Sequence, residues 1–203
     1  MKHRGPRKST PRVTQGEVRK KNDWKLSPDY FDAPDRRTVL VDRQRPGKGF
    51  KHVVTRTDIY RFIELLPDWT ELAVGLNAIV LSAGCGCCYG RYYHAGVVYL
   101  CAWEEKLWVE TTRKYYERDL LQLERLEVEV EQTGEDKFIL KFDESSARVF
   151  QLLGTLLHEL GHHHDRMTTR RQARTGRGEP YAEEYARRYE SVIWDAYVRA
   201  FDR

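Results

Sequence analysis

The sequence lacks any long hydrophobic run. Its 203 residues are 40% hydrophobic and 33% charged, and no apolar stretch approaches the roughly 20 residues that a membrane-spanning helix needs. The first twelve residues carry charge but no apolar segment, so a secretory signal of the usual kind is not expected. We therefore expect a cytoplasmic protein with no membrane contact and with one folded domain of ordinary size.

Cysteine is also scarce, and the four cysteines fall around one glycine-rich segment, CGCCYG. They are Cys85, Cys87, Cys88 and Cys101. Nothing in the sequence indicates an oxidising compartment, so reduced thiols are expected. The C-x-C-C spacing differs from the usual C-x-x-C of zinc sites, and neighbouring residues of a strand point to opposite faces. Passive thiols are therefore favoured over the two alternatives, a second metal site and a redox role.

Histidine is concentrated in one place, because four of the seven histidines lie in HELGHHHD, residues 158–165. His158 and His162 are four residues apart, so on a helix both imidazoles reach a single ion from one face. Neutral imidazole is a preferred zinc ligand. The carboxylate of Glu159 lies beside that ion, where it accepts a proton from a zinc-activated water. The HExxH spacing therefore predicts catalytic Zn²⁺ bound by two histidines, with Glu159 as general base.

The residues before this motif favour a buried helix. Asp143 is a suitable N-cap, and apolar residues recur at helical spacing at Val149, Phe150, Leu153, Leu156, Leu157 and Leu160. A buried HExxH without a metal would leave one carboxylate and two imidazoles in need of partners. This context favours the zinc site over its alternative, a purely structural group of histidines.

The third ligand is sought among carboxylates, because a catalytic zinc needs three protein ligands and one open position. No histidine follows His164, and Thr168 stands where a metzincin would have its third histidine. Residues 178–203 predict a second long helix with Pro180 near its first turn. This segment offers Glu179, Glu183, Glu184 and Glu190.

Glu183 is the preferred ligand, because it lies between small residues at the edge of the helix's apolar stripe. Glu184 is the second choice, and the alternative for both is an ordinary solvated carboxylate. Asp165 is too close in sequence to His162 to complete the site, so it is assigned to outer support of the ligands or to helix termination. His163 and His164 are expected to be solvated or to support the ligands from outside the site.

HELGH, followed about twenty residues later by a helix bearing AEEYA, resembles the HExxH-plus-Glu zincins. The chain is similar to the ImmA/IrrE-like metallopeptidases, and the resemblance is best over residues 145–200. It implies a zincin-like peptidase in which His158, His162 and Glu183 bind Zn²⁺ and Glu159 is the base. The E-A-N-x-F-A signature of that group is present in a loose form.

The remaining segments predict an α+β domain over residues 26–203, with a small mixed or antiparallel sheet. The expected strands are 36–42, 71–84 and 97–102, the last of them in a hairpin over 91–103, and a second hairpin is expected over 126–142. The expected helices are 57–66, 107–126, the active-site helix and the C-terminal ligand helix. In zincins an edge strand borders the cleft, and 96–102 is expected in that position, where it would pair with an extended peptide. Oxyanion donors are sought among Tyr92, Tyr93, His94 and Tyr181.

Residues 1–25 predict a flexible basic tail, because they contain nine Lys or Arg and only two acidic residues. This tail would either contact nucleic acid or another polyanion, or be a solvated extension without a partner. A second basic segment, residues 166–178, is expected to form a loop near the cleft.

Two functions are compatible with these features. The first is a zinc-dependent metallopeptidase acting on a protein or peptide substrate. The alternative is a DNA-associated regulatory or interaction module with a structural zinc. The substrate, the oligomeric state and any latency are not encoded in recognisable motifs.

Overall fold

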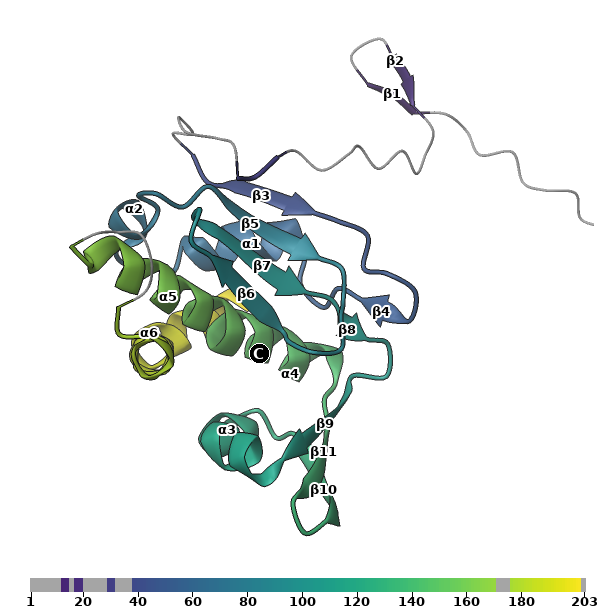
Figure 1. Ribbon diagram of the computed structural model, residues 1–203. Coiled ribbons are helices and arrows are strands. Elements are labelled where there is room, and N and C mark those ends of the chain that lie inside the picture. Colours follow the sequence, from purple (N-terminus) through teal and green to yellow (C-terminus); the bar gives the residue numbers. More distant parts are fainter. Residues whose placement is uncertain (1–11, 15–16, 20–28, 32–37, 171–175, 202–203) are drawn as a thin grey trace, which may run out of the picture.

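The computed structural model describes residues 12–14, 17–19, 29–31, 38–170 and 176–201. Its architecture is α+β, as predicted, with a mixed sheet, an antiparallel sheet and long helices that pack on one another (Figure 1). Most of the basic tail predicted over residues 1–25 lies outside this part of the chain. No helix within the described residues is long and apolar enough to cross a membrane.

The main sheet has the strand order β3-β5-β7-β6. Its strands are β3 (Leu40–Arg43), β5 (Ala78–Ser82), β7 (Val97–Cys101) and β6 (Gly90–Tyr93). The first three are parallel, and β6 runs antiparallel to β7. Every residue of β5 is buried, as expected for the apolar run of a strand covered on both faces.

The prediction that residues 96–102 form an edge strand was wrong about the position of the strand. Residues 97–101 do form a strand, but it lies inside the sheet, and β6 occupies the edge. The turn before β7 has Gly96 at a φ of 75°, and a Cβ at this position would lie 2.0 Å from the carbonyl oxygen of Gly75. Glycine therefore permits the hairpin that folds β6 back onto β7.

A second, antiparallel sheet has the order β10-β11-β9. It contains β9 (Trp108–Thr112), β10 (Glu129–Gly134) and β11 (Lys137–Lys141), and α3 (Arg113–Arg125) connects β9 to β10. The hairpin predicted over 126–142 is confirmed. The helix predicted over 107–126 is wrong at its start, because WVETT pairs with β11 and the helix begins only at Arg113.

The described residues also form two short pairs of strands. β1 (Arg12–Thr14) pairs with β2 (Glu17–Arg19), and β4 (Phe50–Lys51) pairs with β8 (Trp103–Glu104). The first helices are α1 (Arg56–Ile63), which confirms the helix predicted over 57–66, and α2 (Trp69–Leu72). The strand predicted over 71–84 forms only as β5, after α2 and the turn at Gly75.

The active-site helix is continuous from residue 144 to residue 168. It consists of α4 (Glu144–Val149), the π-helical segment η1 (Phe150–Leu156) and α5 (Leu157–Thr168). Asp143 caps it as predicted, since its side chain accepts a hydrogen bond from the Ser146 N–H at 2.6 Å. Such π-helical segments are frequent at functional sites.

The final helix, α6 (Glu179–Phe201), packs against α5, while the active-site helix covers one face of the main sheet (Figure 1). The core lies between these layers and includes Ile79 and Leu100 from the sheet, Leu156 from η1, and Tyr197 from α6. The close helix contact depends on Gly161, where a Cβ would lie 2.9 Å from the Cα of Ala182. The motif helix and the first turns of α6 are thereby held together.

Candidate metal centre

Three donor groups from two helices converge at one point. His158 and His162 lie one turn apart on α5, and Glu179 is the first residue of α6. The two Nε2 atoms are 3.1 Å apart. The carboxylate oxygens of Glu179 lie 3.2 Å from Nε2 of His158 and 3.3 Å from Nε2 of His162. Ligands about 2.0–2.1 Å from a tetrahedral zinc lie about 3.3 Å from one another, so the donors fit this ion.

The structure brings Glu179, rather than Glu183, to the two imidazoles. Glu183 lies one turn later on α6, with its carboxylate 4.0 Å from Nη1 of Arg118 and 3.7 Å from Nη2 of Arg187. Glu184 is exposed and lies 3.9 Å from Arg187. The position of Glu183 beside small residues is therefore not what decides proximity to α5. Which glutamate lies near α5 depends instead on where α6 begins, and the hydrogen bonds of Arg177 and Gly178 to Asp165 set that start.

Glu159 lines the same hollow as the two imidazoles but is only 7% exposed. The backbone N–H of Tyr92 donates a hydrogen bond to its carboxylate, and a Cβ on Gly90 would lie 2.8 Å from its Oε1. Burial raises the pKa of Glu159 to about 8, with a further contribution from the nearby charge of Glu179. The edge strand β6 thus lies directly against the proposed general base.

The two imidazoles are held in the form that binds metals. Burial lowers the pKa of His158 to about 4, and the adjacent His162 adds to this effect. Burial also lowers the pKa of His162, against the opposing influence of Glu179. Neutral imidazole carries the lone pair that a metal ion requires.

Asp165 connects α5 to the start of α6. It is fully buried, and its carboxylate accepts hydrogen bonds from the backbone N–H of Arg177 at 2.8 Å and of Gly178 at 3.0 Å. The Arg177 side chain donates a third bond at 2.8 Å. Because Glu179 follows immediately, these bonds place its carboxylate beside the histidines. The expectation of an outer supporting role for Asp165 agrees with these contacts.

Replacing Asp165 with asparagine should weaken the metal centre without removing a ligand. An amide in this position leaves one of the converging N–H donors without an acceptor, which costs about 1–3 kcal/mol. We expect the free energy of unfolding to fall by this amount and the zinc Kd to rise about 10-fold or more. Chemical denaturation and zinc competition would measure both, with the exposed Asp195→Asn as the matched control. An unchanged zinc Kd would contradict the positioning role.

His163 supports the site from within the core. It is fully buried, with Nε2 3.0 Å from the carbonyl oxygen of Val74 and Nδ1 3.3 Å from the hydroxyl of Tyr92. The hydroxyl of Tyr92 also accepts a bond from Arg166 at 3.2 Å, and its ring stacks on His162 at an interplanar angle of 16°. The solvated alternative for His163 is therefore wrong, and Tyr92 is a packing partner of the His162 imidazole.

Of the other residues considered as oxyanion donors, two lie beside the candidate metal centre and one does not. Tyr93 and His94 line the 450 Å³ hollow that also contains His158, Glu159 and Glu179. Tyr181 instead has its hydroxyl 2.7 Å from Nδ1 of His164 and stacks on that ring. The part of the basic segment 166–178 that spans 171–175 lies outside the described residues, so its predicted place at the cleft is not tested.

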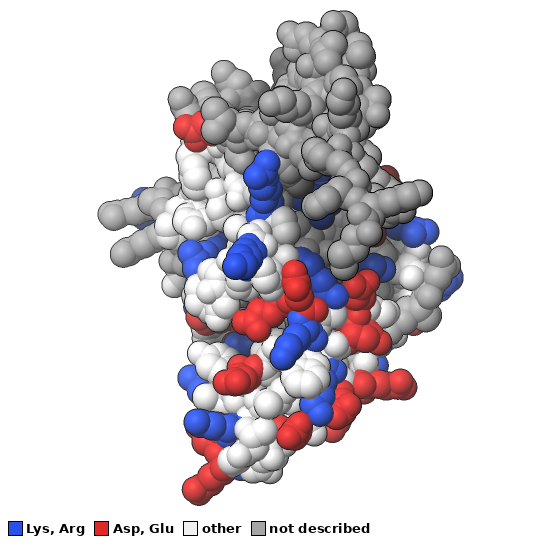
Figure 2. Space-filling view, turned by 90° about the vertical axis from the view of Figure 1, so that its right-hand side faces the viewer, with Lys and Arg blue, Asp and Glu red and all other residues white. Residues whose placement is uncertain are grey.

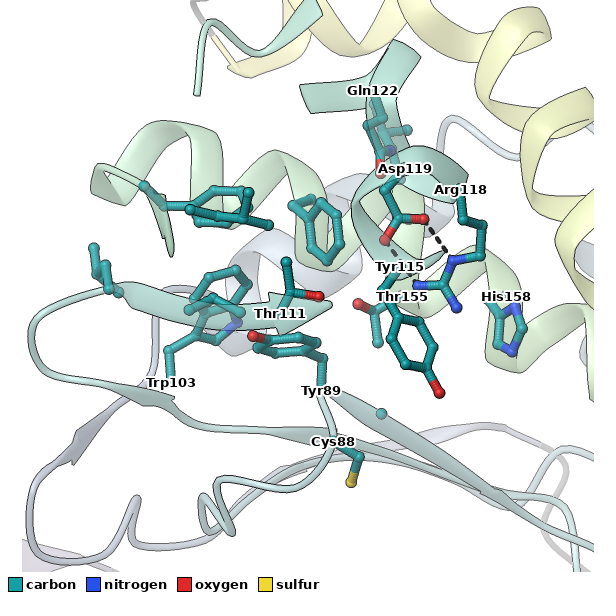
Figure 3. A pocket seen from close by; sticks show the side chains of 18 of the residues that line it. Cys88, Tyr89, Trp103, Thr111, Tyr115, Arg118, Asp119, Gln122, Thr155 and His158 are labelled. Atoms are coloured by element: carbon teal, nitrogen blue, oxygen red, sulfur yellow. Dashed lines mark hydrogen bonds and ion pairs between the residues drawn. The ribbon is translucent and has the colours of Figure 1, made fainter. Parts of the chain in front are cut away.

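A larger cleft of about 1240 Å³ continues from His158 between the active-site helix, α3 and the second sheet. Tyr115 and Arg118 project from α3 into it on the side of His158 (Figure 3). The guanidinium of Arg118 is held by the carboxylate of Asp119 at 2.7 and 2.8 Å. An extended molecule lying in this cleft would pass the proposed metal centre.

The surface drawn in Figure 2 has Lys and Arg interspersed with Asp and Glu. Among the described residues, ion pairs join Lys51 to Glu144 at 2.8 Å and Lys141 to Glu129 at 2.7 Å. A nucleic-acid partner bound through the basic tail remains a prediction, because residues 1–11 and 20–28 lie outside the described part of the chain.

Comparisons with protein-family models, with curated proteins and with solved structures find no match for this chain. The likeness to HExxH-plus-Glu zincins therefore rests on the motif and on the converging His158, His162 and Glu179.

Proposed function

We propose that this protein is a zinc-dependent metallopeptidase with His158, His162 and Glu179 as ligands and Glu159 as general base. The observation that carries the proposal is the mutual spacing of the three donors, 3.1–3.3 Å, which suits one tetrahedral zinc ion. Two histidines and one glutamate form the ligand set of well-known catalytic zinc sites, which keep a fourth position for water or substrate. This arrangement supports catalysis over a purely structural role.

The residues around the centre have separable roles. When bound, zinc supplies a Lewis acid that polarises a substrate carbonyl and lowers the pKa of a water molecule. In its ionised form, which the positive charge of a bound zinc ion would favour against the effect of burial, Glu159 accepts the proton of the attacking water and delivers it to the leaving amine. The N–H of Tyr92 holds that carboxylate in place, and burial keeps bulk water from it. Asp165 keeps Glu179 at the start of α6 in register with α5.

The substrate class follows from the position of β6. This strand lies at the edge of the main sheet, and its residues line the hollow above His158, His162 and Glu159. An extended peptide added to such an edge gains main-chain hydrogen bonds regardless of its sequence. The cleft of about 1240 Å³ beyond His158 provides room for the continuing chain. A peptide or unfolded protein segment is therefore the substrate that this geometry favours.

Removal and return of zinc provide the direct test. We expect the zinc-loaded protein to cleave denatured casein or a degenerate quenched-peptide library, and 1,10-phenanthroline to abolish cleavage. Added Zn²⁺ should restore it and Mg²⁺ should not, because imidazole ligands favour zinc over magnesium. Cleavage that survives complete zinc removal, or no cleavage of either substrate by fully loaded protein, would contradict the proposal.

A further inference from the structure

The four cysteines lie close together beside β6, although Cys101 is 13 residues from Cys88 in the sequence. Cys85, Cys87 and Cys88 lie in the loop between β5 and β6, and Cys101 is the last residue of β7. The sulfur atoms of Cys85 and Cys88 are 3.6 Å apart, and those of Cys88 and Cys101 are 3.7 Å apart. The sulfurs of Cys85, Cys88 and Cys101 all lie within 4.8 Å of one another.

These distances resemble those of a thiolate metal site. Zinc–sulfur bonds of about 2.3 Å in a tetrahedron place neighbouring sulfur atoms about 3.8 Å apart. Cys87 lies closer, with its sulfur 2.6 Å from that of Cys85, so it must rotate slightly to take a separate corner. The loop turns at Gly86, which has a φ of 64°. Cys87 and Cys88 lie between the end of β5 and the start of β6, so the alternation of side chains in a strand does not separate them.

Arg91 on β6 supplies a cation for the same group. Its Nε lies 3.0 Å from the sulfur of Cys88, and its Nη2 lies 3.1 Å from that of Cys87 and 3.6 Å from that of Cys85. Donors of this kind stabilise thiolates, which are the form of cysteine that binds metals. A zinc ion with four thiolates carries a net charge of −2, and the guanidinium offsets half of it.

We propose that Cys85, Cys88 and Cys101 bind a second zinc ion, with Cys87 as its fourth ligand. A site with four protein ligands leaves no open position, so its role is structural. The ion ties the end of β7 to the loop that leads into β6. Because Gly90 and Tyr92 of β6 contact Glu159, the site also fixes the strand that lies against the proposed general base.

Metal counting and cobalt spectroscopy test the site independently of peptidase activity. Elemental analysis of protein purified under reducing conditions should give two zinc ions per chain, and one in Cys85→Ser/Cys88→Ser. The matched control, His158→Ala/His162→Ala, should also retain one ion. With Co²⁺ in place of zinc, sulfur-to-cobalt charge-transfer bands should appear in the wild type and in the His variant and be absent from the Cys variant.

The cobalt spectra of the wild type and the His variant do not depend on whether the Cys variant folds. Absence of the charge-transfer bands from both, with four titratable thiols in the denatured chain, would overturn the proposal. A count of two thiols would also overturn it, because the short Cys85–Cys87 contact would then be a disulfide. Loss of zinc from the histidine centre alone would contradict only the peptidase proposal.

Discussion

Glu159→Gln should retain the full zinc content and lose hydrolysis. The substitution preserves side-chain volume at a position that is only 7% exposed, so the surrounding packing is expected to persist. An amide has no carboxylate to take the proton of the attacking water, and general acid–base groups contribute about 10²–10⁴-fold to rate. We therefore expect kcat to fall by about this factor, measured on the same peptide library with zinc content determined in parallel.

A matched control for this substitution is Glu184→Gln, which makes the same chemical change on an exposed face of α6. It should leave both kcat and zinc content at the wild-type values. If Glu159→Gln cleaved substrate as fast as the wild type, with the same zinc content, Glu159 would not be the base. If it lost zinc as well, the effect on rate would have to be assigned to the metal centre.

Glu179→Ala should weaken zinc binding far more than Glu183→Ala. Glu179 lies 3.2 and 3.3 Å from the two imidazole nitrogens, whereas Glu183 faces Arg118 and Arg187. Loss of an outer partner of a metal ligand costs about 10–100-fold in affinity, so loss of the ligand itself should raise the zinc Kd beyond that range. Its side chain is 71% exposed, so removing it should not disturb the core.

This comparison is best made in the Cys85→Ser/Cys88→Ser background, where a single class of zinc site is titrated against a chromogenic chelator. Glu183→Ala and Glu184→Ala are the matched controls on the same helix, and both should keep the zinc Kd of the background. Weakened binding in Glu183→Ala together with unchanged binding in Glu179→Ala would reverse the assignment and support the ligand that the sequence favoured.

Local sequence signals predicted the elements that hold the proposed centre. Asp143 caps the active-site helix, and the apolar residues predicted to be buried between Val149 and Leu160 are buried, although the helix is covered on nearly all sides there. The final helix begins beside Pro180, and the hairpin over residues 126–142 forms as its alternation indicated. These features depend on residues that are close to one another in the sequence, so a single sequence is enough to predict them.

Other elements depended on partners that are distant in the sequence. Residues 108–112 form a strand because β11 lies beside them, although the segment as a whole resembled the start of a helix. The edge position of β6 follows from the strand order β3-β5-β7-β6, which brings together strands far apart in the sequence. The thiols of Cys88 and Cys101 meet only because β6 and β7 pair. The hairpin over residues 91–103 was predicted from the sequence, and β6 pairs with β7 accordingly, but the order of the strands and the meeting of the thiols leave no periodic signal in a single sequence.

The sequence by itself determined that His158, Glu159 and His162 form one chemical unit, because a four-residue spacing equals about one turn of helix. It also indicated that a third ligand would come from a carboxylate, since no histidine follows His164. Only the tertiary structure distinguished Glu179 from Glu183. The close contact of Gly161 with Ala182 and the hydrogen bonds from Arg177 and Gly178 to Asp165 set where α6 begins beside α5. Those contacts join residues up to 21 positions apart, so local spacing does not encode them.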